Sequence, residues 1–123
     1  MSLANRFILA GIAYGIIGML MGLVMGASGK FDMAPVHAHI ILLGWVSMAL
    51  FGLIYRNIPA MAGEKLAVWQ FWISNLGLII MMITLAMVIN KNMAVAPVLA
   101  VSEIVVVFGM LIFAWLMWKH RTA

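Results

Sequence analysis

The chain consists of four long apolar stretches separated by short polar connections. The apolar stretches cover residues 7–27, 35–55, 66–89 and 94–118. Turn-forming residues occupy the connections, at Ser28-Gly29-Lys30, Pro59 to Lys65 and Asn90-Lys91-Asn92. Each stretch reaches the length of about 20 residues that a helix needs to cross a bilayer. Short connections make successive helices antiparallel. The pattern therefore predicts an all-α, integral membrane, four-helix up-down bundle that forms a single transmembrane domain over residues 1–123.

Composition excludes most other classes of protein. Hydrophobic residues make up 67% of the chain and charged residues only 8%, with a mean hydropathy of +1.21. About a quarter of the residues in a soluble domain are charged, so a water-soluble fold and a disordered chain are both excluded. The basic residues form no patch that would bind nucleic acid. There are no cysteines, which excludes disulfides and thiolate chemistry. The first stretch lacks a small-residue cleavage site, so we expect it to remain as a span.

The charged residues predict how the bundle is oriented. One set of chain ends and connections carries five of the seven Lys and Arg residues: Arg6, Arg56, Lys65, Lys119 and Arg121. The opposite connections carry Lys30 and Lys91. The positive-inside rule then places both termini in the cytoplasm, as in a multi-pass protein of the bacterial inner membrane. The aromatic residues expected at the cytoplasmic interface are Tyr55, Trp69, Trp72, Trp115 and Trp118.

Five glycines lie on one face of the first span. They are Gly11, Gly15, Gly18, Gly22 and Gly26, spaced three or four residues apart. Ladders of small residues allow the backbones of neighbouring helices to approach closely. The flattened face predicts either tight packing against another helix or contact with a planar ligand.

Two histidines near the start of the second span are the main candidates for cofactor or metal binding. His37 and His39 lie at the outer end of this helix, whose dipole favours the neutral imidazole that ligates metals. They are about 200° apart around a regular helix, so they cannot serve one site. Below His37 lie Gly44, Met48 and Gly52, a face of little bulk. We therefore expect His37 to be the primary ligand and His39 to be a supporting or second-site group. The alternative is two interfacial histidines in contact with water and headgroups.

Glu103 is the one acidic residue inside a predicted span. A carboxyl group at this depth is expected to be protonated or hydrogen-bonded, because hydrocarbon disfavours its charged form. It could relay protons, orient a ligand or join subunits. It could also form a structural clasp to Gln70, Asn75 or Thr84, or to a neighbouring chain.

The segment that begins at the histidines resembles a known family. Residues 37–55, HAHIILLGWVSMALFGLIY, resemble the second transmembrane helix of haem–copper oxidase catalytic subunits, especially in the nitric oxide reductase branch. The resemblance is closer still to small four-helix proteins related to that subunit. Its elements are the two histidines, Leu43-Gly44-Trp45 and the Gly52 to Tyr55 exit. The resemblance implies a haem b with His37 as axial ligand, used for electron transfer or for binding NO or O₂.

The chain departs from that family in a way that excludes a complete terminal oxidase. The full subunit has many more helices, which supply the opposite haem ligand and the copper histidines. The only other histidine here, His120, follows the fourth span on the opposite side of the membrane. A second haem ligand could come from His37 or His39 of another copy, which suggests a homodimer or homotrimer. It could instead be Met25, Met33 or Met93, or be absent, leaving a position for a gas. Whether the chain catalyses any reaction stays open.

Two other functions fit the same residues. The first is outward-facing copper binding, since imidazole and thioether ligands suit copper; the candidate ligands are His37, His39, Met25, Met33 and Met93, with Asp32 nearby. The second is a non-catalytic assembly subunit that docks on a respiratory-chain partner, with the glycine ladder and Glu103 as interface. A small multidrug exporter is disfavoured, because the first span has no acidic residue.

Overall fold

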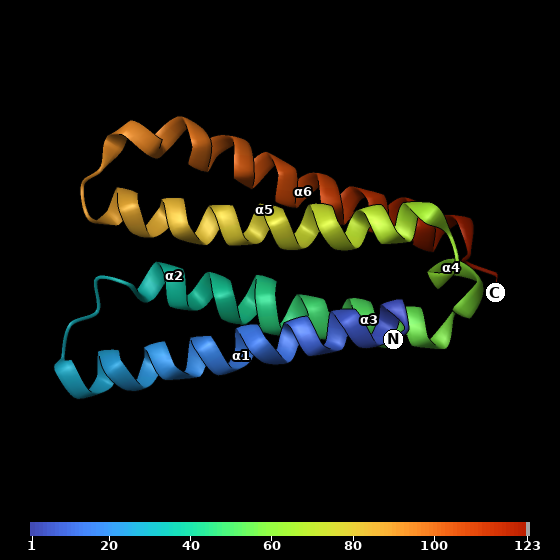
Figure 1. The fold of residues 1–123 in the computed structure, drawn as a ribbon, viewed down its shortest axis with the longest axis horizontal. Helices are drawn as coiled ribbons and strands as arrows, with labels where there is room; N and C mark the ends of the chain where they lie inside the picture. Colours follow the sequence, from blue (N-terminus) through green and yellow to red (C-terminus); the bar gives the residue numbers. More distant parts are fainter. Residues whose placement is uncertain (123) are drawn as a thin grey trace.

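The computed structural model describes residues 1–122 and contains four long, apolar helical spans (Figure 1). The first span is α1 (Leu3–Ser28), and the third is α5 (Lys65–Ile89). The second is continuous through α2 (Ala34–His39), the π-helix η1 (Ile40–Val46) and α3 (Ser47–Asn57). The fourth joins the 3-10 turn η2 (Met93–Val95) to α6 (Ala96–Lys119). A short helix, α4 (Pro59–Ala62), lies in the second connection. The predicted all-α, up-down arrangement is confirmed.

The connections turn where the sequence predicts. The Ser2 hydroxyl accepts a hydrogen bond from the Asn5 backbone N–H and caps the start of α1. Gly29 ends α1 with a φ of 69°, a left-handed conformation that glycine adopts without strain. Lys91 takes the same φ of 69° in the turn between α5 and η2. These connections are short enough to make neighbouring spans antiparallel.

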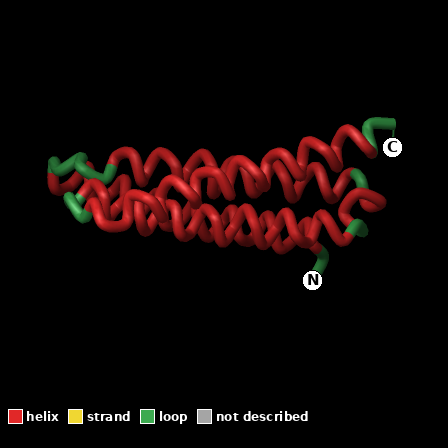
Figure 2. Tube along the Cα trace, turned by 90° about the horizontal axis from the view of Figure 1, so that it is seen from above, coloured by secondary structure: helices red, strands yellow, loops and turns green. Residues whose placement is uncertain are grey.

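The spans form two helical hairpins. One hairpin pairs α1 with α2, η1 and α3, and the other pairs α5 with α6, as Figure 1 shows. Figure 2 shows the connecting loops gathered at the two ends of the bundle. Packing is much more extensive within each hairpin than between the two. Both termini lie beside α4 at one end of the bundle, which we call the terminal end (Figure 1). The opposite end carries residues 29–33 and 90–92, and we call it the loop end. All five basic residues predicted to share a side lie in segments of the terminal end.

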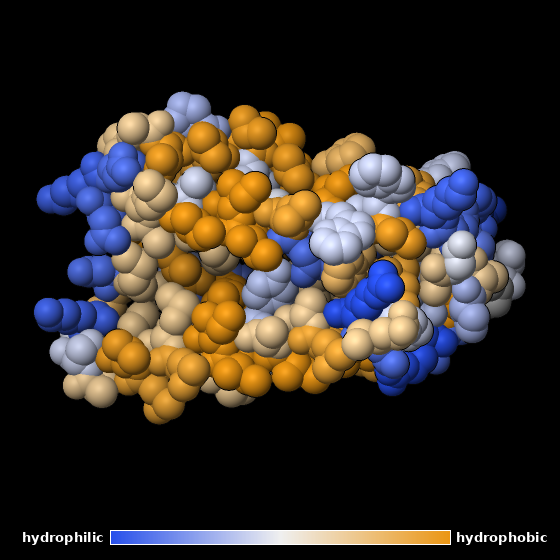
Figure 3. All heavy atoms as spheres, in the orientation of Figure 1, coloured by the Kyte–Doolittle hydropathy of each residue, from blue (hydrophilic) through white to orange (hydrophobic). Residues whose placement is uncertain are grey.

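Apolar side chains cover most of the middle of the molecule, and hydrophilic groups gather mainly at its two ends (Figure 3). Large apolar side chains point outward from every span; examples are Leu23, Leu42, Ile83 and Ile104. Such a surface would be unfavourable in water and suits contact with lipid hydrocarbon. The length and composition of its four helices therefore indicate a multi-pass membrane protein.

An aromatic cluster joins all four spans near the terminal end. The Phe7 ring stacks on Tyr55, with 5.3 Å between centroids, and meets Phe71 edge-on at 4.9 Å. Phe51 and Phe113 lie 4.6 Å apart and close the cluster between α3 and α6. Aromatic pairs at these distances add to the apolar burial. This cluster fixes the two hairpins to each other at the end opposite His37 and His39.

The aromatic residues expected at the interface divide into two groups. Four of the five tryptophans are exposed on the outer surface: Trp69, Trp72, Trp115 and Trp118. Tyr55 instead is fully buried within the aromatic cluster. Its hydroxyl donates to the Gln70 side-chain oxygen at 2.9 Å, so it joins helices rather than anchoring them at the membrane surface.

The π-helix η1 is the main departure from the regular helices that the sequence predicts. The Ser47 hydroxyl donates to the Leu42 carbonyl, five residues earlier, at 2.8 Å. Buried positions follow every four residues here, at Val36, Ile40, Gly44 and Met48. A spacing of four drifts around an α-helix of 3.6 residues per turn, and a wider π-turn keeps it on one line. The stretch thus presents a straight stripe of side chains to α1.

Candidate functional site

His37 lies half-buried between α2 and α1. Its Nδ1 atom is 2.8 Å from the Gly18 carbonyl oxygen of α1. A Cβ atom at Gly22 would lie only 3.1 Å from His37 Cε1, so the glycine makes room for the imidazole. A carbonyl oxygen can only accept a hydrogen bond, which assigns the proton of a neutral ring to Nδ1. Nε2 then keeps its lone pair, the arrangement found in metal-ligating histidines.

His39 lies in a different environment from His37. It is exposed, and its Nδ1 atom is 2.6 Å from the Pro35 carbonyl oxygen of its own helix. This contact links no second span. Within residues 1–122, no group of three or more His, Asp or Glu side chains is placed to hold a metal ion. Any metal or cofactor bound by either histidine therefore needs ligands of another type or from another molecule.

The low-bulk face predicted below His37 is filled by α1. A Cβ atom at Gly44 would lie 2.6 Å from Tyr14 Cβ, and one at Gly52 would lie 2.7 Å from the Ala4 carbonyl oxygen. Met48 between them is buried, with 2% of its surface exposed. With α1 in this position, Gly44, Met48 and Gly52 leave no room for a planar ligand. The sequence offered no means to decide between a helix and a ligand as the occupant.

The glycine ladder of α1 serves tight helix packing, the first of its two predicted roles. A Cβ atom at Gly11 would lie 3.1 Å from the Trp45 carbonyl oxygen, and one at Gly15 would lie 3.3 Å from the Trp45 ring. A Cβ atom at Gly18 would clash with Ile41 Cδ1, at a distance of 2.4 Å. Gly26, in contrast, has open space around it. The ladder ends at Gly22, where the neighbour is the ring of His37.

A groove at the loop end brings several predicted ligands together. Its volume is ≈ 600 Å³, within the usual size of ligand pockets. We call it the methionine groove, and its lining residues are Ile17, Leu20, Met21, Val24, Met25, Ser28, Lys30, Asp32, Met33 and Asn90. It thus joins the predicted Met25, Met33 and Asp32, and adds Met21. Neither histidine nor Met93 lines it.

Buried polar side chains connect the two hairpins. The Tyr14 hydroxyl donates to the Asn75 side-chain oxygen at 2.9 Å, which links α1 to α5. Gln70 accepts from Tyr55 and donates to the Ser74 hydroxyl at 3.2 Å. Among the residues described, no buried side-chain nitrogen or oxygen lacks a hydrogen-bond partner. Asn75, which the sequence offered as a possible partner of Glu103, is bonded instead to a tyrosine of α1.

Replacing Tyr55 with phenylalanine is expected to destabilise the bundle by about 1 kcal/mol, in the upper half of the range for membrane hydrogen bonds. The substitution keeps the ring in the aromatic cluster and leaves the fully buried Gln70 oxygen without its donor. Unfolding in mixed micelles measures the change. In a Gln70→Leu background the same substitution should cost much less, and an equal cost would show that the hydrogen bond is not the cause.

Glu103 does not form the predicted clasp within the chain. It is exposed on α6, and no hydrogen bond or ion pair involves it among residues 1–122. Its expected partners are engaged elsewhere, because Gln70 and Asn75 bond to the two tyrosines. Thr84 donates to the Ile80 carbonyl of its own helix at 2.8 Å. The carboxyl group therefore faces the lipid side of the bundle.

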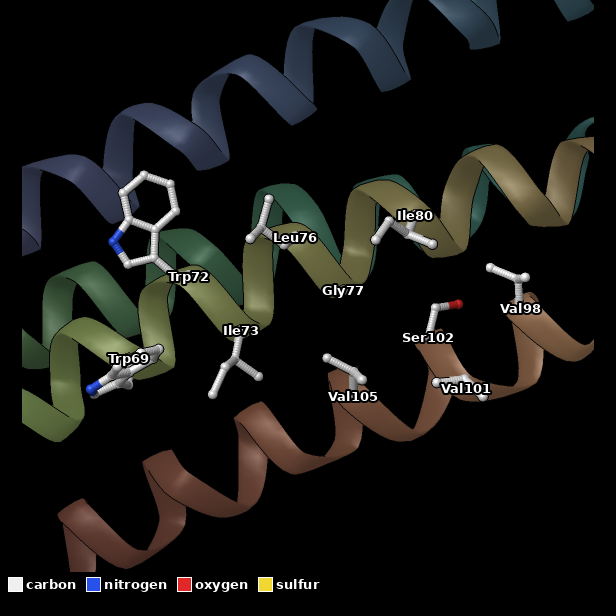
Figure 4. Close-up of a pocket in the computed structure, with 10 residues that line it drawn as sticks. All are labelled: Trp69, Trp72, Ile73, Leu76, Gly77, Ile80, Val98, Val101, Ser102 and Val105. Carbon is white, nitrogen blue, oxygen red and sulfur yellow. The ribbon is translucent and has the colours of Figure 1, made fainter.

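A second groove, between α5 and α6, is apolar (Figure 4). It measures ≈ 340 Å³ and is lined by Trp69, Trp72, Ile73, Leu76, Gly77, Ile80, Val98, Val101, Ser102 and Val105. The Ser102 hydroxyl already donates to the Leu99 carbonyl at 2.7 Å. No His, Lys or carboxylate is among these lining residues. The groove therefore offers no acid or base for catalysis, and its apolar lining suits an acyl chain.

A polar clamp holds the C-terminal end of α6 to the loop before α5. The Glu64 carboxylate accepts a hydrogen bond from Lys119 Nζ at 2.7 Å and another from the His120 ring. These hydrogen bonds, first that of Lys119 and then that of His120, hold the pKa of Glu64 below its ordinary value. His120 thus lies at the terminal end, away from His37, as predicted.

Acid is expected to release this clamp. Because folding lowers the pKa of Glu64, its stabilising effect is present above the ordinary carboxyl pKa, about 4.3, and is lost as pH falls through the lowered value. Hydrogen–deuterium exchange of the amides of residues 116–120 should therefore accelerate in acid beyond the intrinsic change. Glu64→Gln should remove that extra acceleration; if it persists in the variant, another group controls it.

These features define the class of protein as a small multi-pass membrane bundle, with four apolar spans, polar ends and a half-buried histidine toward the loop end. No family model, curated protein or solved structure matches the chain.

Proposed function

We propose that this protein binds a haem b in the inner membrane of a bacterium, with Nε2 of His37 as an axial ligand. The observation that carries the proposal is the contact between His37 Nδ1 and the Gly18 carbonyl oxygen at 2.8 Å. This contact orients the ring and leaves Nε2 as the ligating nitrogen. The resemblance of residues 37–55 to the haem-ligating helix of the oxidase family supports the same ligand. The proposal places the termini in the cytoplasm, in line with the distribution of Lys and Arg.

The macrocycle would extend from His37 toward the methionine groove, which the imidazole itself does not line. The lining of the groove is apolar along α1, and Lys30 at its rim offers a cation for the haem propionates. Met33 lies one turn before His37, whose backbone N–H donates to the Met33 carbonyl at 2.9 Å. Met21 and Gly22 are neighbours on α1, so the groove and the imidazole share this part of the helix. Met25 or Met33 could supply a second ligand.

A bound haem b would supply one-electron transfer, or binding of NO or O₂ at an open coordination position. The part of this chain is to orient the imidazole through Gly18 and to surround the group with apolar side chains. His39 remains a supporting group, since it is exposed and bonded to its own helix. Electron transfer would require a respiratory-chain partner.

Identification of the chromophore tests the proposal. Protein purified in mild detergent from haem-replete cells should be coloured and contain non-covalent haem b that acidified acetone extracts. A second copy could share one haem, so the expected content is one haem per chain or one per two chains. A colourless protein that also fails to bind added hemin would contradict the proposal.

Copper binding is a second candidate, favoured by one observation. Three thioethers, from Met21, Met25 and Met33, line the methionine groove together with the Asp32 carboxylate. Soft thioether ligands select Cu(I). Titration with Cu(I) against a competing chelator should detect a site that Met25→Ile/Met33→Ile removes. Met93→Ile is the matched control, because Met93 does not line the groove. Equal Cu(I) binding by both variants would exclude this site.

A further inference from the structure

Glu103 presents a carboxyl group to the hydrocarbon. It lies seven residues after the start of α6 at Ala96, about 10 Å along the helix axis. It is exposed, and its nearest neighbours on the helix surface are apolar; among them are Ala100, Val107 and Ile104. An unpartnered carboxyl group at this depth is costly, and residues of this kind usually face a protein partner or a water-filled cavity. Among residues 1–122, no hydrogen bond or ion pair gives Glu103 a partner.

The carboxyl group lies within a regular stripe of exposed residues on α6, two of which, Val107 and Met110, also line a groove of ≈ 250 Å³ bordered by α3. The helix packs on α5 through its opposite side, which includes Ser102 and Gly109. The stripe, which we call the Glu103 stripe, consists of the exposed residues Ala100, Glu103, Val107, Met110 and Ala114. Their spacing alternates between three and four residues, as in the seam of a coiled coil. Alanine at both ends would let two helix backbones approach closely.

We propose that a second copy of this chain covers the Glu103 stripe, so that the two Glu103 carboxyl groups hydrogen-bond to each other. Copies inserted in the same direction are related by a two-fold axis along the membrane normal, which brings each stripe residue near its own counterpart. A protonated carboxyl group has one donor and free acceptor positions, so two of them satisfy each other. A second copy is the occupant whose chemistry matches, because it brings an identical carboxyl group to the same depth.

The inference does not rest on haem binding, and cysteine cross-linking tests it directly. The chain has no cysteine, so single-cysteine variants give unambiguous products. Ala100→Cys and Val107→Cys should form disulfide-linked dimers in native membranes treated with a permeant oxidant. Their immediate neighbours are the controls: Val101→Cys and Phe108→Cys, both exposed on α6 but outside the stripe. At least a five-fold higher dimer yield at the stripe positions is expected. Equal yields at all four positions, or no dimer at any, would overturn the proposal.

Substitution of the carboxyl group tests its role in the pairing. In the Val107→Cys background, Glu103→Gln should keep most of the dimer, because a side-chain amide also donates and accepts. Glu103→Leu should lower the yield several-fold while the chain still inserts, since leucine suits lipid. An undiminished yield with Glu103→Leu would show that the carboxyl pair does not hold the copies together. A Glu103→Leu chain that fails to accumulate leaves the comparison of stripe and control positions decisive.

Discussion

Replacement of His37 by alanine is expected to remove haem from the purified protein. The substitution deletes the ring that the Gly18 carbonyl of α1 orients, and the other imidazole of α2, that of His39, contacts only its own helix. The Soret absorbance per chain should fall to the background level. His39→Ala is the matched control, since His39 is exposed and bonded only to its own helix; that variant should keep most of the absorbance.

Substitutions at two glycines give a second test in which His37 itself is not replaced. A valine at Gly22 would push against the His37 ring, whose Cε1 lies 3.1 Å from the position of a Cβ atom. A valine at Gly26 meets open space. Gly22→Val should therefore lose or shift the Soret band, while Gly26→Val should resemble the parent protein. Identical spectra for the two variants would indicate that the ring orientation does not matter.

The substitution Gly52→Ala is expected to have the largest effect on stability. The added Cβ atom would lie 2.7 Å from the Ala4 carbonyl oxygen, a backbone atom that cannot move without shifting α1. Overpacking of this kind costs about 1–3 kcal/mol. Gly26→Ala adds the same methyl group in open space and should change stability by about 1 kcal/mol or less.

Unfolding of both variants in mixed micelles, followed by circular dichroism, measures the difference. If Gly52→Ala is as stable as Gly26→Ala, the close approach of α1 and α3 is not what holds the first hairpin together. A partial rescue by Ile8→Ala would support the contact, because the atom nearest to the new methyl group is Ile8 Cγ1, at 2.6 Å.

Hydrophobic length predicted the spans to within a few residues. The first span begins at Leu3 rather than residue 7, because the Ser2 hydroxyl caps the helix and the first turn includes the polar residues Asn5 and Arg6, which an apolar stretch leaves out. The turn-forming residues also predicted the positions of the connections correctly. Side-chain orientation was harder to predict. Most of α6 is apolar on all sides, so no periodicity indicated that Glu103 faces outward and Ser102 faces α5.

The candidate site could be predicted only in part. The position of His37 at a helix end follows from the residues around Pro35, but its partner, the Gly18 carbonyl, is a backbone atom of another span. The same difficulty applies to Tyr55, which looks like an interface residue and is buried by its bond to Gln70. A signal for η1 was present in the four-residue spacing of buried positions, although it appears only once burial is known.

The absorption spectrum of a His37→Gly variant, recorded with and without added imidazole, tests the central claim most directly. The claim that Nε2 of His37 ligates a haem predicts that the Soret band of the purified protein is lost in the variant. Imidazole, which can enter the space left by the side chain, should restore the band at the wavelength of the parent protein. A His37→Gly variant whose spectrum matches the parent protein without imidazole would contradict the claim.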